Sequence, residues 1–310
     1  MSPHASTHSS PHPINLTDPK EPTTMTATLN RSTTTDRDSS TDPTASPTIT
    51  ATGAALRTDT RVTLSRVAKS EWLKFRTVRS NTIALGGAMV AVVGFGALFA
   101  SLAGSGDGPG RLAENGLSLS LGGFQLSQII IAILGVALVA GEYQTGLIRT
   151  WFGAAPDRMR VLTAKVGVFG SLVFGTSLVA GVLAFLAGQA LLPAEFTALT
   201  LGSAGVAQAL VGAAFYMACI GVIGIGLGFL LRSTAAGAGA VVTTLFIAPI
   251  MVDLQQSSIG DTFGKLLPSY AGSAIQGMET TSAGWGTAVL LGWVIAIVGA
   301  AAVSLKRRDA

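Results

Sequence analysis

The polar side chains with the most chemical potential lie between two long apolar runs, in residues 141–165. Glu142, Tyr143 and Arg149 form the main polar constellation of the chain, and they contain no metal-ligand set. The segment also holds further basic residues: Arg158, Arg160 and Lys165. In a membrane protein such a segment must lie in water or among headgroups, because unpaired charge in hydrocarbon is costly. We therefore expect docking or coupling here rather than catalysis.

Catalytic, metal-binding and nucleotide-binding sites are not expected in the rest of the chain either. No group of His, Asp, Glu or Cys has a catalytic arrangement, so we predict that the chain is not an enzyme and holds no cofactor or metal. His4, His8 and His12 have helical spacing, but the prolines around them argue against a helix. Residues 260–265 differ from a phosphate-binding loop, with too few residues between the glycines and Leu266 where Ser or Thr is needed.

The composition is that of a membrane protein. Of the 310 residues, 49% are hydrophobic and only 12% are charged, whereas a soluble domain typically carries about 25% charged residues. Several apolar runs of roughly 20 residues are continuous rather than alternating, which favours helices over barrel strands. We predict an all-α polytopic membrane protein. Its basic residues cluster at the ends of the apolar runs, so the net charge of +4 does not indicate nucleic-acid binding.

The chain divides into three predicted parts. Residues 1–60 are rich in Ser, Thr and Pro and are expected to be a disordered cytoplasmic tail. Residues 61–80 are expected to form an amphipathic interfacial helix, and residues 81–310 a transmembrane domain. The six predicted spans are 81–103, 121–140, 166–192, 206–231, 235–252 and 285–305.

The amphipathic helix carries an apolar stripe at helical spacing, formed by Leu64, Val67, Ala68, Trp72, Phe75 and Val78. Glu71 falls within this stripe, where lipid contact alone would disfavour it, and Lys74 lies one turn away as a possible partner. Two interpretations stay open: a simple membrane-surface anchor, or a helix that also contacts a protein partner.

The distribution of basic residues predicts the orientation. Fourteen Lys and Arg residues flank the spans on one side and two on the other, not counting the tail. By the positive-inside rule, both termini and the 141–165 segment are cytoplasmic, in a bacterial plasma membrane. No charged residue lies inside a predicted span. Any active transport must therefore be powered from outside the spans, since ion-coupled transporters usually need an intramembrane carboxylate or histidine.

Small residues are prominent in the spans. Gly224 and Gly228 form a G-x-x-x-G pattern, which permits close helix packing in lipid. The pattern fits internal packing or an interface between subunits. Pro249 predicts a kink in the fifth span.

Several motifs resemble those of one family, the permease subunits of ABC transporters of the second, exporter type. Residues 141–149, Gly-Glu-Tyr-Gln-Thr-Gly-Leu-Ile-Arg, match a G-E-Y-x-T-G-x-I-R motif after the second span. Residues 71–74, Glu-Trp-Leu-Lys, match an E-W-x-K-like motif, and Ala164-Lys165 match an A-K that enters the third span. Residues 267–275 resemble an L-P-x-x-A-G-x-A-I stretch. The resemblance extends over residues 62–308.

The resemblance implies a separate cytoplasmic ATPase subunit, which would carry ATP and magnesium, and a second permease copy or homologue. It places a coupling helix in segment 141–165, with the amphipathic helix beside it. The implied coupling residues are Glu71, Lys74, Glu142, Tyr143, Gly146, Arg149, Arg158 and Lys165. Physically, Gly146 permits a turn, Arg149 offers a planar fork for a carboxylate, and the other basic residues either join the coupling surface or extend to lipid phosphates. The alternative function is a membrane scaffold or sensor that transports nothing.

Overall fold

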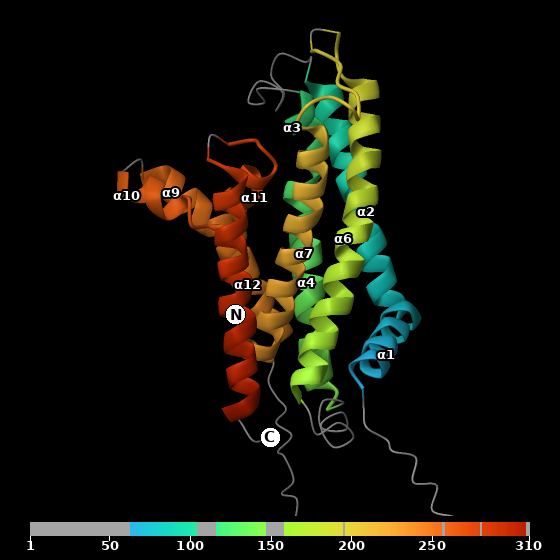
Figure 1. Ribbon diagram of the computed structural model, residues 1–310, viewed down its shortest axis with the longest axis vertical. Coiled ribbons are helices and arrows are strands. Elements are labelled where there is room, and N and C mark those ends of the chain that lie inside the picture. The colour runs from blue at the N-terminus through green and yellow to red at the C-terminus, as the bar shows by residue number, and fades with distance from the viewer. Residues whose placement is uncertain are drawn as a thin grey trace, which may run out of the picture. The chain divides into compact units, whose positions relative to one another are not determined.

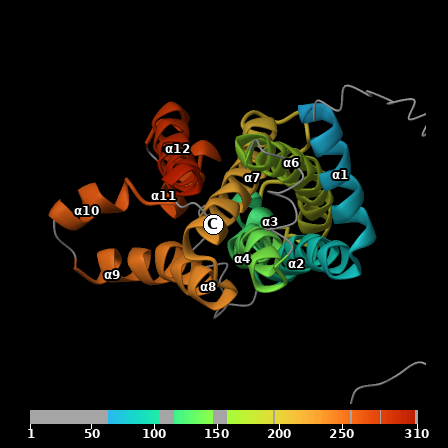
Figure 2. The same ribbon diagram turned by 90° about the horizontal axis from the view of Figure 1, so that it is seen from below.

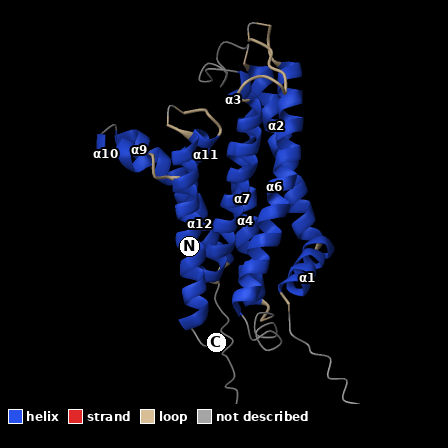
Figure 3. Cartoon of the chain, viewed as in Figure 1, coloured by secondary structure: helices blue, strands red, loops and turns tan. Residues whose placement is uncertain are grey.

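The computed structural model describes residues 63–103, 116–146, 158–194, 196–255, 258–279 and 281–307. The predicted disordered tail, residues 1–60, lies outside these ranges. All regular structure in the described part of the chain is helical, as Figure 3 shows. The predicted all-α class is therefore confirmed.

Figure 1 shows the helices in their order along the chain. They are α1 (Leu64–Thr77), α2 (Arg79–Leu102), α3 (Gly116–Leu121), α4 (Gly123–Gln144), α6 (Arg158–Leu191), α7 (Val206–Leu231), α8 (Thr234–Val242), the π-helix η2 (Thr243–Ile247), α9 (Ala248–Gln255), α10 (Ser258–Gly264), α11 (Pro268–Ile275) and α12 (Ala283–Arg307).

Within the described residues, six helical segments are long and apolar enough to cross a membrane, judged by length and composition. They are α2, α3 with α4, α6, α7, the continuous run of α8, η2 and α9, and α12. These segments coincide with the six predicted spans to within a few residues, except at the start of α6. That helix begins at Arg158 rather than near 166, so Lys165 lies inside a helix and not in a loop.

Helix α7 forms the centre of the bundle. It packs against α4, α6 and α12, and most of its residues are buried. Helix α2 packs against α4 and α6 on the side away from α12, and α1 packs mainly against α6 (Figure 1). α11 lies against α12 and α7. The core is thus built from the second, third and fourth spans, while α12 and the α8–α9 segment lie at its periphery.

Glycines allow α4 and α7 to pack closely against each other. A Cβ atom added to Gly224 would lie 2.3 Å from the carbonyl oxygen of Ala132, and one added to Gly228 would lie 2.9 Å from that of Val136. A side chain at either position would collide with the backbone of the neighbouring helix. Gly224 and Gly228 therefore pack inside the chain, against α4.

The fifth span contains a widened turn. Its helix passes from α8 through η2 into α9, with the backbone N–H of Ala248 bonded to the Thr243 carbonyl, five residues back. Pro249 follows directly. A proline ring crowds the carbonyl four residues earlier, here that of Leu245 within η2, and a wider turn relieves such crowding. The structure thus shows a π-helical turn on the N-terminal side of Pro249, and the kink predicted there stays a prediction.

Candidate functional site

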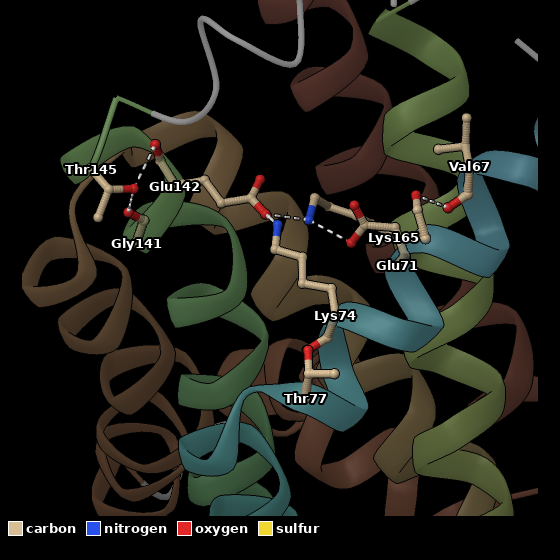
Figure 4. A network of polar contacts seen from close by, with 9 residues as sticks. Val67, Glu71, Lys74, Thr77, Gly141, Glu142, Thr145 and Lys165 are labelled. Atoms are coloured by element: carbon tan, nitrogen blue, oxygen red, sulfur yellow. Dashed lines mark hydrogen bonds and ion pairs between the residues drawn. The ribbon is translucent and has the colours of Figure 1, made fainter.

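Four charged side chains from three helices meet at the end of the bundle where α1 packs. Glu71 and Lys74 come from α1, Glu142 from the last turn of α4, and Lys165 from the second turn of α6. Figure 4 shows them directed toward one another between these helices. We refer to these four residues as the charge cluster.

Lys165 is the centre of the charge cluster. Its Nζ donates a hydrogen bond of 2.7 Å to Glu71 Oε2 and another of 2.7 Å to Glu142 Oε1. Lys74 Nζ also donates to Glu142 Oε1. Two carboxylates thus face two ammonium groups, and the formal charges balance. Burying a charge is costly unless it is paired and hydrogen-bonded, so this balance lets the cluster sit inside the protein.

The cluster is largely shielded from solvent. The side chains of Glu142 and Lys165 are 6% and 4% exposed, whereas that of Lys74 is 26% exposed. Lys74 is therefore the member of the charge cluster that is most accessible to solvent. Burial, and next the nearby charge of Lys165, lower the pKa of Lys74 to about 8, against an opposing effect of Glu71.

Apolar contacts hold α1 in place around the charges. The inward face of α1 reads Val67, Glu71, Phe75, one residue every four, and all three are buried. The ring of Phe75 lies 6.0 Å from that of Phe169 on α6, centroid to centroid. Val67 packs with Val161 and Ala164 in a second small cluster. Glu71 is thus placed among apolar side chains that exclude water from its ion pair.

The predicted apolar stripe of α1 was wider than the face that the structure buries. Val67 and Phe75 turn inward as expected, but Leu64 and Trp72 are 50% and 45% exposed. These outer apolar residues leave a second surface of α1 free to contact lipid. One face of α1 is thus docked on the bundle of its own chain, and another is suited to the membrane interface. Contact of α1 with a protein partner stays a prediction.

A turn ends α4 just beyond the cluster. Gly146 has a positive φ of 71°, a conformation that favours glycine, so the turn predicted there is confirmed. The Thr145 hydroxyl donates to the Gly141 carbonyl at 2.9 Å. Together these features end the helix at Gln144, two residues after Glu142, and place that carboxylate in the last turn.

Tyr143 links the same end of α4 to α7. Its ring meets Phe229 edge-on, with centroids 6.4 Å apart, and the guanidinium carbon of Arg232 lies 5.0 Å from the Tyr143 ring centroid. Arg232 caps α7 with a left-handed backbone, at φ 52°. The predicted coupling residue Tyr143 is therefore a packing contact between α4 and the α7–α8 corner, beside the charge cluster but not part of its ion pairs.

The predicted site residues fall into three groups. The structure brings Glu71, Lys74, Glu142 and Lys165 together, and it places Tyr143 and Gly146 next to them. Arg149 lies outside the described residues, and Arg158 starts α6 without a described side chain.

Two predictions about Lys165 are corrected. The sequence placed this residue in a loop, where contact with lipid phosphate was an alternative, but its side chain is 4% exposed and bonded to two carboxylates. It is therefore an internal ion-pair partner. The expected pairing of Glu71 with Lys74 was incomplete, because Lys165 is the donor that bonds to Glu71. The four-residue spacing of Val67, Glu71 and Phe75 was the available signal that Glu71 faces the bundle.

A comparison with protein-family models found no matching family, and a search of curated proteins found no matching relative.

Proposed function

We propose that this chain is the membrane-spanning permease subunit of an ATP-driven ABC exporter. In this proposal two permease subunits form the translocation path, and a separate cytoplasmic ATPase subunit supplies the energy. The six apolar helices and the amphipathic helix before the first of them are consistent with this role.

One observation supports the proposal most. Three separate motifs carried the resemblance in this half of the chain: Glu71–Lys74, Gly141–Arg149 and Ala164–Lys165. Each contributes at least one charged side chain to the same buried cluster: Glu71 and Lys74, Glu142, and Lys165. Motifs that lie 94 and 23 residues apart in sequence thus meet in one structural element.

The cluster suggests how coupling would work. It joins α1, α4 and α6 at the end of the bundle from which the chain leaves α4 toward residues 147–157 and returns at α6. A force applied by an ATPase to that connection would reach the second span, the third span and α1 together. Glu71, Glu142 and Lys165 are then positioning residues that make the three helices move as one body, rather than contacts to the ATPase.

Co-purification from native membranes tests the proposal. The full chain is crosslinked in the membrane, extracted in mild detergent, and its partners are identified by mass spectrometry. We expect a subunit with a nucleotide-binding motif in a 1:1 ratio, crosslinked to segment 141–165 or to α1. A preparation that contains the chain and no such subunit would favour the scaffold or sensor function instead.

A further inference from the structure

A cavity of about 100 Å³ lies where the fifth span leaves the bundle. Its lining includes Ile223 and Leu227 of α7. It also includes Val241 of α8, Leu245 of η2 and Ile297 of α12. None of these residues belongs to the charge cluster, so this is a separate site.

Glycine contacts explain why the cavity forms at this level. A Cβ at Gly237 of α8 would lie 2.4 Å from Val136 of α4, and one at Gly226 of α7 would lie 2.6 Å from Ile297 of α12. α8 and α12 are therefore each held close to the central helices. Figure 2 shows α8 and α12 on different sides of α7, with α9 leading away from the bundle. The cavity is lined by residues of both α8 and α12.

The cavity offers no polar atom that needs a new partner. The Thr244 hydroxyl in its wall already donates to the Ala240 carbonyl at 2.9 Å. The indole N–H of Trp293 donates to the Leu266 carbonyl at 2.8 Å. The lining contains no charged residue. Because a buried water needs two to four polar partners, such a space favours an apolar occupant.

The helices that border the cavity face an apolar medium. Ile247 and Ile250 are 47% and 52% exposed next to the η2 wall, and Ile295 of α12 is 70% exposed. All belong to segments long and apolar enough to cross a membrane. The apolar groups available at this depth are therefore lipid chains.

The wall itself has unusual backbone structure. η2 supplies Thr244 and Leu245 to the lining, and π-helical turns often occur at functional sites because they redirect side chains within a helix. Here the π-helical turn, which is wider than an α-helical turn, borders the cavity and lets the helix continue through Pro249.

We propose that this cavity binds the end of one hydrocarbon chain of a bilayer lipid or lipid-like molecule. Its volume sets the size of the occupant, since an apolar cavity of about 150 Å³ takes up a molecule as small as benzene. The terminal part of a chain fits, and the remainder lies between α9 and α12. This assignment stands on the cavity alone and does not depend on an ATPase partner.

Photocrosslinking tests the assignment. The full chain is reconstituted in phosphatidylcholine vesicles that contain a small fraction of a phospholipid with a diazirine at the end of one acyl chain. After illumination, labelled residues are mapped by mass spectrometry. We expect the label to concentrate on residues 220–227, 241–245 and 293–297, relative to equally apolar surfaces elsewhere on α2 and α6.

Variants that fill the cavity with side chains of increasing size distinguish lipid binding in the cavity from general contact with lipid. Thr244→Leu is expected to lower the label on the cavity residues, and Thr244→Phe to remove most of it. Ile250→Phe adds a similar ring to the exposed face of the same segment and should leave the label unchanged. The assignment is overturned if the wild-type label spreads evenly over the exposed apolar surfaces, or if both Thr244 variants retain it in the cavity. The wild-type distribution decides the question even where a variant fails to fold.

Discussion

At the scale of single residues, Lys165 is the part of the site on which the others depend. Its amine bonds to both carboxylates, and its own side chain is nearly inaccessible. Removing one member of a buried ion pair leaves an uncompensated charge, which costs more than the pair itself contributes. The integrity of the α1–α4–α6 junction should therefore respond more strongly to Lys165 than to exposed lysines.

Lys165→Met should lower the free energy of unfolding in detergent by about 3–5 kcal/mol, because Glu71 and Glu142 lose a shared partner. The matched control is Lys69→Met on the exposed side of α1, which should stay within about 0.5 kcal/mol of wild type. Adding Glu142→Gln to Lys165→Met should recover part of the loss. Equal stability of the Lys165 and Lys69 variants would contradict the internal ion pair.

Lys74 should titrate near physiological pH. In the folded protein its amine should react half-maximally with an acylating reagent at about pH 8, as its lowered pKa requires. In the unfolded chain the same residue should behave like an ordinary lysine, with a pKa near 10.4. Peptide mapping after pulse labelling across a pH series measures both. Identical midpoints in the two states would show that Lys74 is not part of a buried cluster.

The sign of the linked effect on stability follows from the same shift. Between about pH 8 and 10.5 the unfolded chain holds more protons at Lys74 than the folded chain does. The contribution of Lys74 to the free energy of unfolding therefore rises with pH in this window. Below pH 8 the cost of holding the charged amine is fully present.

At the scale of the helices, contact between α4 and α7 depends on the absence of side chains. Gly224→Ala should destabilise the fold by about 1–3 kcal/mol, since its Cβ meets a rigid backbone oxygen on α4. Gly239→Ala is the control, because a Cβ there meets no atom within 4 Å. That substitution should be neutral or stabilising by up to about 1 kcal/mol, from helix propensity. Thermal unfolding in detergent compares the two, and equal effects would refute the close contact.

Helix positions were predictable where the apolar pattern was uninterrupted. α7 runs from Val206 to Leu231, as predicted, because Gly205 and Arg232 bound a continuous apolar run. The start of α6 was placed too late because Lys165 resembled a loop residue. Its charge is compensated by groups 23 and 94 residues away, and local sequence does not contain that information. The π-helical turn likewise depends on Pro249 and on packing. A hydropathy pattern does not show this kind of backbone feature.

At the scale of the whole molecule, the candidate site was predicted as a set of residues but not as a geometry. Six of the eight predicted coupling residues lie at or beside one junction, and each was singled out by a motif or an unusual position in an apolar stripe. That Glu71, Glu142 and Lys165 form one network follows only from the way α1 folds back onto α6.

The orientation of the molecule is testable independently of its partners. The end of the bundle that carries α1 also carries the Lys306–Arg307 end of α12 (Figure 1), and the positive-inside rule predicts that this end faces the cytoplasm. A green fluorescent protein fused after residue 310 should fluoresce, whereas alkaline phosphatase fused there should be inactive. The opposite pair of results would invert the topology and remove the cytoplasmic coupling site.

ATP hydrolysis by the complex purified from native membranes shows whether the charge cluster couples this chain to an ATPase, as we propose. Glu142→Gln should remain inserted in normal amount yet lower hydrolysis roughly tenfold, as expected for a coupling free energy of 1–3 kcal/mol. The matched control, Lys306→Gln at the same end of the bundle, should keep the wild-type rate. Wild-type hydrolysis in Glu142→Gln, or a complex that hydrolyses no ATP at all, would contradict the account.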